Sequence, residues 1–208
     1  GPTIQRVKQY QKSDLAFTIQ PPSYLATIWA LVNDNTYIYA GGASNVRRYL
    51  KPNLVYTGPT GAYGGTIRAL AQDAGFIFAG GDTIFTVRKY EKTGMTAIAE
   101  SPSYGATIWA LAQDADFIYA GGATTQTIRK YKKSDLTLVA ESPNYNGTIY
   151  ALATSVGIPV VSTDPASLVQ LTQATLNGTL DNDGGEACAC AFEYGLTTAY
   201  GTVTSTQS

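Results

Sequence analysis

Residues 107–122 read TIWALAQDADFIYAGG, and this segment decides the fold because close copies of it occur elsewhere in the chain. Residues 27–42 read TIWALVNDNTYIYAGG, and residues 66–81 read TIRALAQDAGFIFAGG. A shorter copy, TIYAL, stands at residues 148–152. Successive copies start 39 to 41 residues apart, so the chain is built from a repeated unit of about 40 residues.

Two other markers recur in the same register. One is a basic segment of the type VRKY, and the other is the loop tyrosine of the segments PPSY, GAY, SPSY and SPNY. The first marker ends at Tyr10, Tyr49, Tyr90 and Tyr131, and the second is Tyr24, Tyr63, Tyr104 and Tyr145.

Each repeat contains four segments of strand character. TIWALAQD is apolar on both faces, as expected of an inner strand packed between neighbouring sheets. DFIYAGG follows an Asp turn and ends in a glycine pair, QTIRKY alternates apolar and charged residues, and LTLVAES is a short outer strand. We therefore predict an all-β fold in which residues 27–65, 66–106 and 107–147 form four-stranded blades of a β-propeller, with TIxAL innermost. The alternative is a solenoid of β-hairpins.

The repeats resemble the propeller superfamily that includes kelch, WD-repeat and quinoprotein-like folds. They are most similar to the YAGG…KSDLxxVAESPxYxGTIxAL repeats of phage tail and microbial surface proteins. The resemblance covers residues 3–157, and we assign residues 1–157 to the propeller. The Gly-His pair and the Trp-Asp dipeptide of WD repeats are missing, and the kelch pattern is met only by the glycine pairs.

The chain begins and leaves the repeat pattern inside a blade. Residues 3–26 supply the third and fourth strands, and residues 148–154 supply the inner strand. We expect three complete blades plus one composite blade from these two segments. One chain could then close a ring of four blades, or two chains a ring of eight. A third possibility is that flanking repeats have been cut away.

The repeat stops near Gly157 and the composition changes. Residues 158–208 contain the run TQATLNGTL…GGEACACAFEYGLTTAYG, which resembles the front half of a fibronectin type III-like domain. DNDGGE, at residues 181–186, predicts a hairpin turn between its strands. Half of such a sandwich leaves an apolar face and a strand edge in need of a partner.

The composition argues against several classes of function. The chain has 208 residues, a formal net charge of -1 and no histidine. The charge balance gives no reason to expect nucleic acid, and no apolar run is long enough for membrane insertion. Without histidine, a Ser-His-Asp or Cys-His arrangement is impossible. We expect no enzyme activity, no cofactor and no metal site.

One position inside TIxAL varies while its neighbours do not. Large side chains there would lie at the mouth of a propeller channel, where Trp, Tyr and Arg often bind partners and aromatic rings stack on sugars. The alternative is plain packing between blades. This candidate ligand site comprises Trp29, Arg68, Trp109 and Tyr150.

Basic residues also recur at one position of the third strand, where they form a candidate anion-binding stripe. The alternative is that they pair with Glu100, Glu141 or solvent. The stripe comprises Lys8, Arg47, Arg88 and Arg129.

The acidic turn residues and the two cysteines give weaker signals. Asp34, Asp73 and Asp114 each stand nearly alone, so we interpret them as turn formers rather than cation ligands.

Cys188 and Cys190 share one face of a predicted strand, where a bond between them would be strained. We expect free thiols, with an intermolecular disulfide or a metal site as alternatives.

These features favour a non-catalytic binding or structural module of a virion tail or microbial surface. Its expected partners are a protein or glycan receptor or neighbouring subunits, including copies of itself through composite blades. Its expected location is extracellular, at a cell surface or on a virion. The alternatives are a subunit of an extracellular filament or tube, and an enzyme propeller of quinoprotein-like or lyase type.

Overall fold

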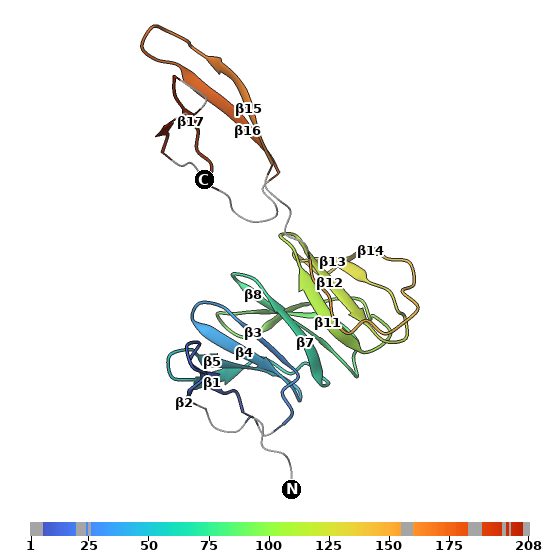
Figure 1. Ribbon diagram of the computed structural model, residues 1–208. Coiled ribbons are helices and arrows are strands. Elements are labelled where there is room, and N and C mark those ends of the chain that lie inside the picture. Colours follow the sequence, from blue (N-terminus) through green and yellow to red (C-terminus); the bar gives the residue numbers. More distant parts are fainter. Residues whose placement is uncertain are drawn as a thin grey trace. The chain divides into compact units, whose positions relative to one another are not determined.

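The computed structural model describes residues 6–19, 24, 26–154, 160–182, 189–196, 199 and 201–205. These residues form β-strands and no helix, which confirms the predicted all-β class (Figure 1). The described residues therefore include no helix that could cross a membrane. The chain divides into two compact units, Gly1–Thr154 and Ser155–Ser208.

Three antiparallel four-stranded sheets, which we call the first, second and third blades, make up most of the first unit. Each follows the chain in simple order, so strands adjacent in sequence pair with each other. The first blade comprises β3 (Ala30–Asn33), β4 (Tyr37–Gly41), β5 (Val46–Leu50) and β6 (Val55–Pro59). The second comprises β7 (Ile67–Gln72), β8 (Phe76–Gly81), β9 (Arg88–Glu91) and β10 (Ala97–Glu100). The third comprises β11 (Ile108–Gln113), β12 (Phe117–Gly122), β13 (Arg129–Lys132) and β14 (Leu138–Glu141).

The first strands of the blades are the inner ones. β7 contacts both β3 and β11, while β6, β10 and β14 are the last strands of their sheets. Equivalent residues pair in each blade. For example, Leu70 pairs with Ala79 in the second blade, and Leu111 pairs with Ala120 in the third. The sequence repeat is therefore also a repeat of strand register, and the hairpin solenoid is not what the chain forms.

The glycine pair that ends each second strand allows blades and strands to approach closely. A Cβ on Gly80 would lie 2.7 Å from Cγ2 of Ile108, the first residue of the next blade's inner strand. A Cβ on Gly81 would lie only 1.9 Å from the carbonyl oxygen of Thr66. The first glycine thus makes room for the neighbouring blade, and the second for the blade's own inner strand.

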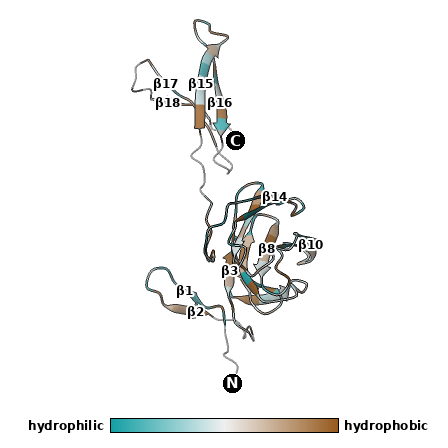
Figure 2. Cartoon of the chain, turned by 90° about the vertical axis from the view of Figure 1, so that its right-hand side faces the viewer, coloured by the Kyte–Doolittle hydropathy of each residue, from teal (hydrophilic) through white to brown (hydrophobic). Residues whose placement is uncertain are grey.

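The hydrophobic core lies at the junctions between blades. Two of the three buried clusters combine residues of one blade with residues of the next, and the third combines the first blade with Val7 and Tyr24, which precede it in the chain. Figure 2 shows hydrophobic residues along β3 and β8, two of the strands that face these junctions. Tyrosines are the largest side chains in these clusters, and the hydroxyls of Tyr24, Tyr63 and Tyr104 each donate to a backbone carbonyl.

The described residues of the two ends do not form the expected composite blade within one chain. β1 (Gln9–Tyr10) pairs only with β2 (Phe17–Ile19), in a sheet of two strands. Residues 148–154 form no strand and lie instead against the third blade, where Cγ2 of Ile149 occupies the space beside Gly121. The physical reason is a missing strand, because no copy of the IYAGG segment follows TIYAL to join the two halves.

The second unit contains two small antiparallel sheets. β15 (Val160–Ser167) pairs with β16 (Thr175–Asn182), and β17 (Glu193–Tyr194) pairs with β18 (Thr202–Val203). The sequence predicted a hairpin between residues 174–180 and 187–195, but β16 pairs with β15 instead. Most of the predicted turn, residues 183–186, lies outside the described residues, as does Cys188.

Candidate functional site

The four variable residues of the inner-strand segments form one continuous row, which we call the aromatic row. The guanidinium carbon of Arg68 lies 4.0 Å from the ring centroid of Trp29 and 4.9 Å from that of Trp109. The ring centroids of Trp109 and Tyr150 are 5.9 Å apart. The cation is therefore held between two indole rings, and a third ring extends the row.

A carboxylate fixes the arginine of the aromatic row. Nη2 of Arg68 lies 3.1 Å from Oδ2 of Asp82, and Nε of Arg68 donates to the same oxygen at 3.2 Å. The other oxygen of Asp82 accepts from the backbone N–H of Thr66, so the carboxylate itself is anchored. Arg68 is thus prevented from folding away from the two tryptophan rings.

The ends of the row face solvent. Trp29 is 50% exposed and Tyr150 is 70% exposed. Trp29 and Tyr150 are therefore not buried between blades, while Arg68 and Trp109, inside the row, are half-buried. An exposed aromatic surface with a cation and a carboxylate at its centre offers both stacking faces and hydrogen-bonding groups to a ligand.

The candidate anion stripe is arranged differently. Arg88 and Arg129 form ion pairs with Glu100 and Glu141, at 2.8 and 3.1 Å. Each also donates to a loop carbonyl, that of Ala62 for Arg88 and that of Ser103 for Arg129, at 2.7 Å in both cases. These two guanidinium groups join the third strand of a blade to its fourth strand and to the preceding loop.

The remaining members of the stripe have different surroundings. The guanidinium carbon of Arg47 lies 4.6 Å from the ring centroid of Tyr24, and Lys8 is exposed. The structure therefore does not bring the four cations together on one free surface.

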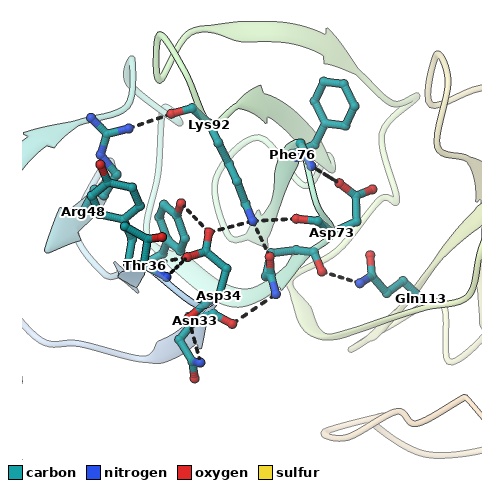
Figure 3. A network of polar contacts seen from close by, with 12 residues as sticks. Asn33, Asp34, Thr36, Arg48, Asp73, Phe76, Lys92 and Gln113 are labelled. Carbon is teal, nitrogen blue, oxygen red and sulfur yellow. Dashed lines mark hydrogen bonds and ion pairs between the residues drawn. The ribbon is translucent and has the colours of Figure 1, made fainter. Parts of the chain in front are cut away.

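A polar network that was not predicted from the sequence joins the first and second blades (Figure 3). Nζ of Lys92 donates to Oδ2 of Asp34 at 2.9 Å and to the carbonyl oxygen of Asp73 at 2.5 Å, and also contacts the amide oxygen of Gln72. At the next junction, Nζ of Lys133 lies 3.5 Å from Oδ2 of Asp73.

The turn aspartates hold their turns as predicted. Oδ1 of Asp34 accepts from the backbone N–H groups of Thr36 and Tyr37, and Oδ1 of Asp114 accepts from those of Asp116 and Phe117. Burial acts to raise the pKa of Asp34. The hydrogen bonds from Lys92 and from the backbone N–H groups of Tyr37 and Thr36 outweigh burial and hold this pKa well below 3.8. Asp34 is therefore ionised at neutral pH.

The second unit contains a hollow of about 1110 Å³ between its two sheets. Its lining includes apolar side chains, among them Leu176, Phe192 and Tyr194. Cys190 also lines it and carries a free thiol. No group of three acidic or cysteine residues in the described part of the chain is placed to hold a metal ion.

Comparison with known proteins identifies the fold but no family. No family model and no curated protein matches the sequence. The computationally designed Ika8 protein is similar in structure, with a TM-score of 0.64 and 15% identity over 74% of this chain and 48% of that chain. The WD40 β-propeller domain of Doa1 has a TM-score of 0.58 and 12% identity over 66% of this chain and 48% of that one.

The WD40 repeats of RRP9 give a similar result, with a TM-score of 0.57 and 10% identity over 62% of this chain and 42% of that one. This chain thus spans less than half the length of each of these three structures. At such low identity the likeness concerns the fold alone. It agrees with the sheet order and the register described above, so the blades of the first unit have the fold of a β-propeller.

Proposed function

We propose that the protein is a non-catalytic binding module whose ligand platform is the aromatic row. The observation that carries the proposal is the stack in which Arg68 lies between the rings of Trp29 and Trp109 while the end of the row at Tyr150 is exposed. Exposing such a row to water costs free energy, and its residues belong to none of the three buried clusters between blades. It therefore has the character of a preformed binding surface.

A glycan is the ligand that suits this surface best. Aromatic faces stack on the apolar faces of sugar rings, and the carboxylate of Asp82 and the guanidinium of Arg68 can bind hydroxyl groups beside them. The near-zero net charge of the chain gives a strongly charged ligand no long-range attraction. A protein receptor is the second class of ligand, and it would use the same residues as hot spots.

Tryptophan fluorescence tests the proposal directly because the only two tryptophans of the chain, Trp29 and Trp109, both lie in the row. Glycans that bind the full-length protein on an array should shift or quench its emission in solution. The double variant Trp29→Ala/Trp109→Ala should lose at least tenfold in affinity, measured by calorimetry. Tyr56→Ala is the matched control, since it removes an exposed ring on β6 outside the row.

Two outcomes would contradict the proposal. Equal binding by the double variant and the parent would remove the row from the site. Turnover of a bound glycan by the parent protein would show that the module is catalytic.

We further propose that the protein acts at the surface of a virion tail or a microbial cell. The repeat resemblance supports this location, and so does the second unit, interpreted as part of a fibronectin type III-like domain. Its residues Leu171 and Leu196 are fully exposed, as expected of a partial sandwich that a neighbouring subunit completes. Antibodies against the protein should label intact particles or cells, and labelling only after lysis would contradict this location.

A further inference from the structure

We propose that a second copy of the chain docks head to tail on the first, with the β1–β2 hairpin of one copy against the third blade of the other. Two such contacts would close a ring of two copies. The inference does not depend on the ligand proposal. It rests on a comparison of the junctions inside the chain with the two faces left at its ends.

The internal junctions share one set of buried residues. On one side of each junction lie a third-strand tyrosine and, five residues later, a leucine or methionine with a left-handed backbone. On the other side lies the ring of the loop tyrosine. The third-strand tyrosines are Tyr49, Tyr90 and Tyr131, the apolar residues are Leu54, Met95 and Leu136, and the loop tyrosines are Tyr24, Tyr63 and Tyr104, all of them at most 5% exposed.

The hairpin carries the same residues, and there they are exposed. Tyr10 and Leu15 are the repeat equivalents of Tyr49 and Leu54, yet they are 48% and 74% exposed. Both leucines have a left-handed backbone, with φ of 57° at Leu15 and 49° at Leu54. The hairpin therefore presents a preformed junction face. Because Tyr10 and Leu15 are exposed, no other described part of the chain covers this face.

The third blade presents the opposite half of a junction. Tyr145 is the repeat equivalent of the buried Tyr63 and Tyr104, yet it is 70% exposed. Tyr63 and Tyr104 donate from their hydroxyls to the carbonyl oxygens of Thr86 and Thr127, both at 2.6 Å. In the same register, the hydroxyl of Tyr145 would meet the carbonyl of Arg6 in the second copy.

Charge complementarity supports the same partner. Inside the chain, a lysine two residues after the third-strand tyrosine pairs with the turn aspartate of the preceding blade, as Lys92 does with Asp34 and Lys133 with Asp73. In this register the carboxylate of Asp114 would pair with a lysine of the following blade. Lys12 of the hairpin is the repeat equivalent of Lys92 and Lys133. Among the described residues neither Lys12 nor Asp114 forms an ion pair within the chain.

Residues 148–154 already occupy the inner-strand position beside the third blade, where the backbone N–H of Ile149 donates to the carbonyl of Gly122 at 3.0 Å. With the hairpin of the second copy outside them, they would form a blade of three segments. Such a contact joins two different surfaces, so it must either close a ring or continue as a fibre. We propose closure at two copies, which the match to the designed Ika8 protein supports, because this chain covers 48% of that protein's length.

The experiment measures the mass of the full-length protein in solution and the contact between its copies. Light scattering should give about 44 kDa, twice the 22.0 kDa of one chain. A zero-length carbodiimide cross-linker should join Lys12 to Asp114. In a mixture of ¹⁴N- and ¹⁵N-labelled protein, this cross-link should connect light to heavy chains. The link between Lys133 and Asp73 should stay within one chain and serves as the internal reference.

Three variants sharpen the test. Leu15→Asp should weaken self-association at least tenfold while the hairpin remains folded, because Asp tolerates the left-handed backbone. Leu138→Asp is the matched control, since Leu138 lies exposed on the outer strand β14, and it should leave the mass unchanged. Asp114→Asn keeps the turn acceptor but should abolish the cross-link. A monomer of 22.0 kDa, a cross-link confined to one chain, or a fibre would overturn the proposal.

Discussion

Nζ of Lys92, on the second blade, lies 2.9 Å from Oδ2 of Asp34 on the first blade. The two residues are 58 positions apart in the chain, so the contact exists only when the blades are docked. The lysine side chain is only 10% exposed, and its ammonium group is held by oxygens from both blades. Substitutions of either residue should therefore report on the stability of the junction between the first and second blades.

Replacing Lys92 with Met should lower the free energy of unfolding by about 2 kcal/mol. The loss is below that for a fully buried pair because the side chain of Asp34 keeps some contact with water. Urea unfolding followed by tryptophan fluorescence measures it, since Trp29 and Trp109 both belong to the first unit. Lys51→Met, at the equivalent position of the first blade, should cost less than about 0.5 kcal/mol. Equal effects of the two variants would show that the contact with Asp34 contributes nothing.

The first unit should lose stability in acid. Because the pKa of Asp34 is lower in the folded than in the unfolded protein, its contribution is fully present above the unfolded pKa of about 4 and is lost as the pH falls below it. Asp34→Asn keeps the turn acceptor but removes the charge. The variant should therefore show a flatter dependence of the urea midpoint on pH between about 2 and 5. An unchanged slope would contradict the assignment.

Gly81→Ala should destabilise the first unit by more than about 3 kcal/mol, because the new methyl group would meet the carbonyl oxygen of Thr66 at 1.9 Å and backbone cannot yield as a side chain does. Gly75→Ala is the control, since nothing lies within 4 Å of a Cβ at that turn position. Thermal unfolding followed by circular dichroism compares the two. Similar melting temperatures would mean that the glycine pair is not required for packing.

The cation between the two indole rings should contribute to stability as well as to binding. A double-mutant cycle of Trp29→Leu and Arg68→Met should give a coupling energy of about 0.5–1 kcal/mol. Unfolding must be followed by far-ultraviolet circular dichroism, because one of the tryptophans is replaced. Coupling near zero would indicate that the 4.0 Å approach of Arg68 to Trp29 carries no energy.

The strands and their order were predictable because each depends on local features that the repeat shows several times. The Asp turn, the glycine pair and the apolar inner segment mark the same three points in each blade, so a strand assigned in one copy is checked by the others. The aromatic row was predictable for the same reason. Trp29, Arg68, Trp109 and Tyr150 share one register of the repeat, and equal positions of successive inner segments lie side by side.

The junction network was not predicted because its partners lie on different repeats and the sequence does not show which residues face each other. The recurrence of lysine at residues 12, 51, 92 and 133, in step with Asp34, Asp73 and Asp114, was the available signal. The composite blade does not form within one chain, for a different reason. The two matching ends lack a copy of the second strand, the segment that joins the first strand to the third along the chain in every complete blade.

The hydroxyl of Tyr63 donates to Thr86, and that of Tyr104 to Thr127, so each bond has its donor in one repeat and its acceptor in the next. This arrangement has a consequence for how such genes can change length. Duplication or loss of one whole period leaves each donor facing an acceptor of the same kind, wherever the cut falls within the period. Gain or loss of part of a period leaves a tyrosine hydroxyl and a carbonyl without partners. Unequal recombination between repeats is therefore tolerated in whole units, which favours arrays whose blades differ in number but not in design.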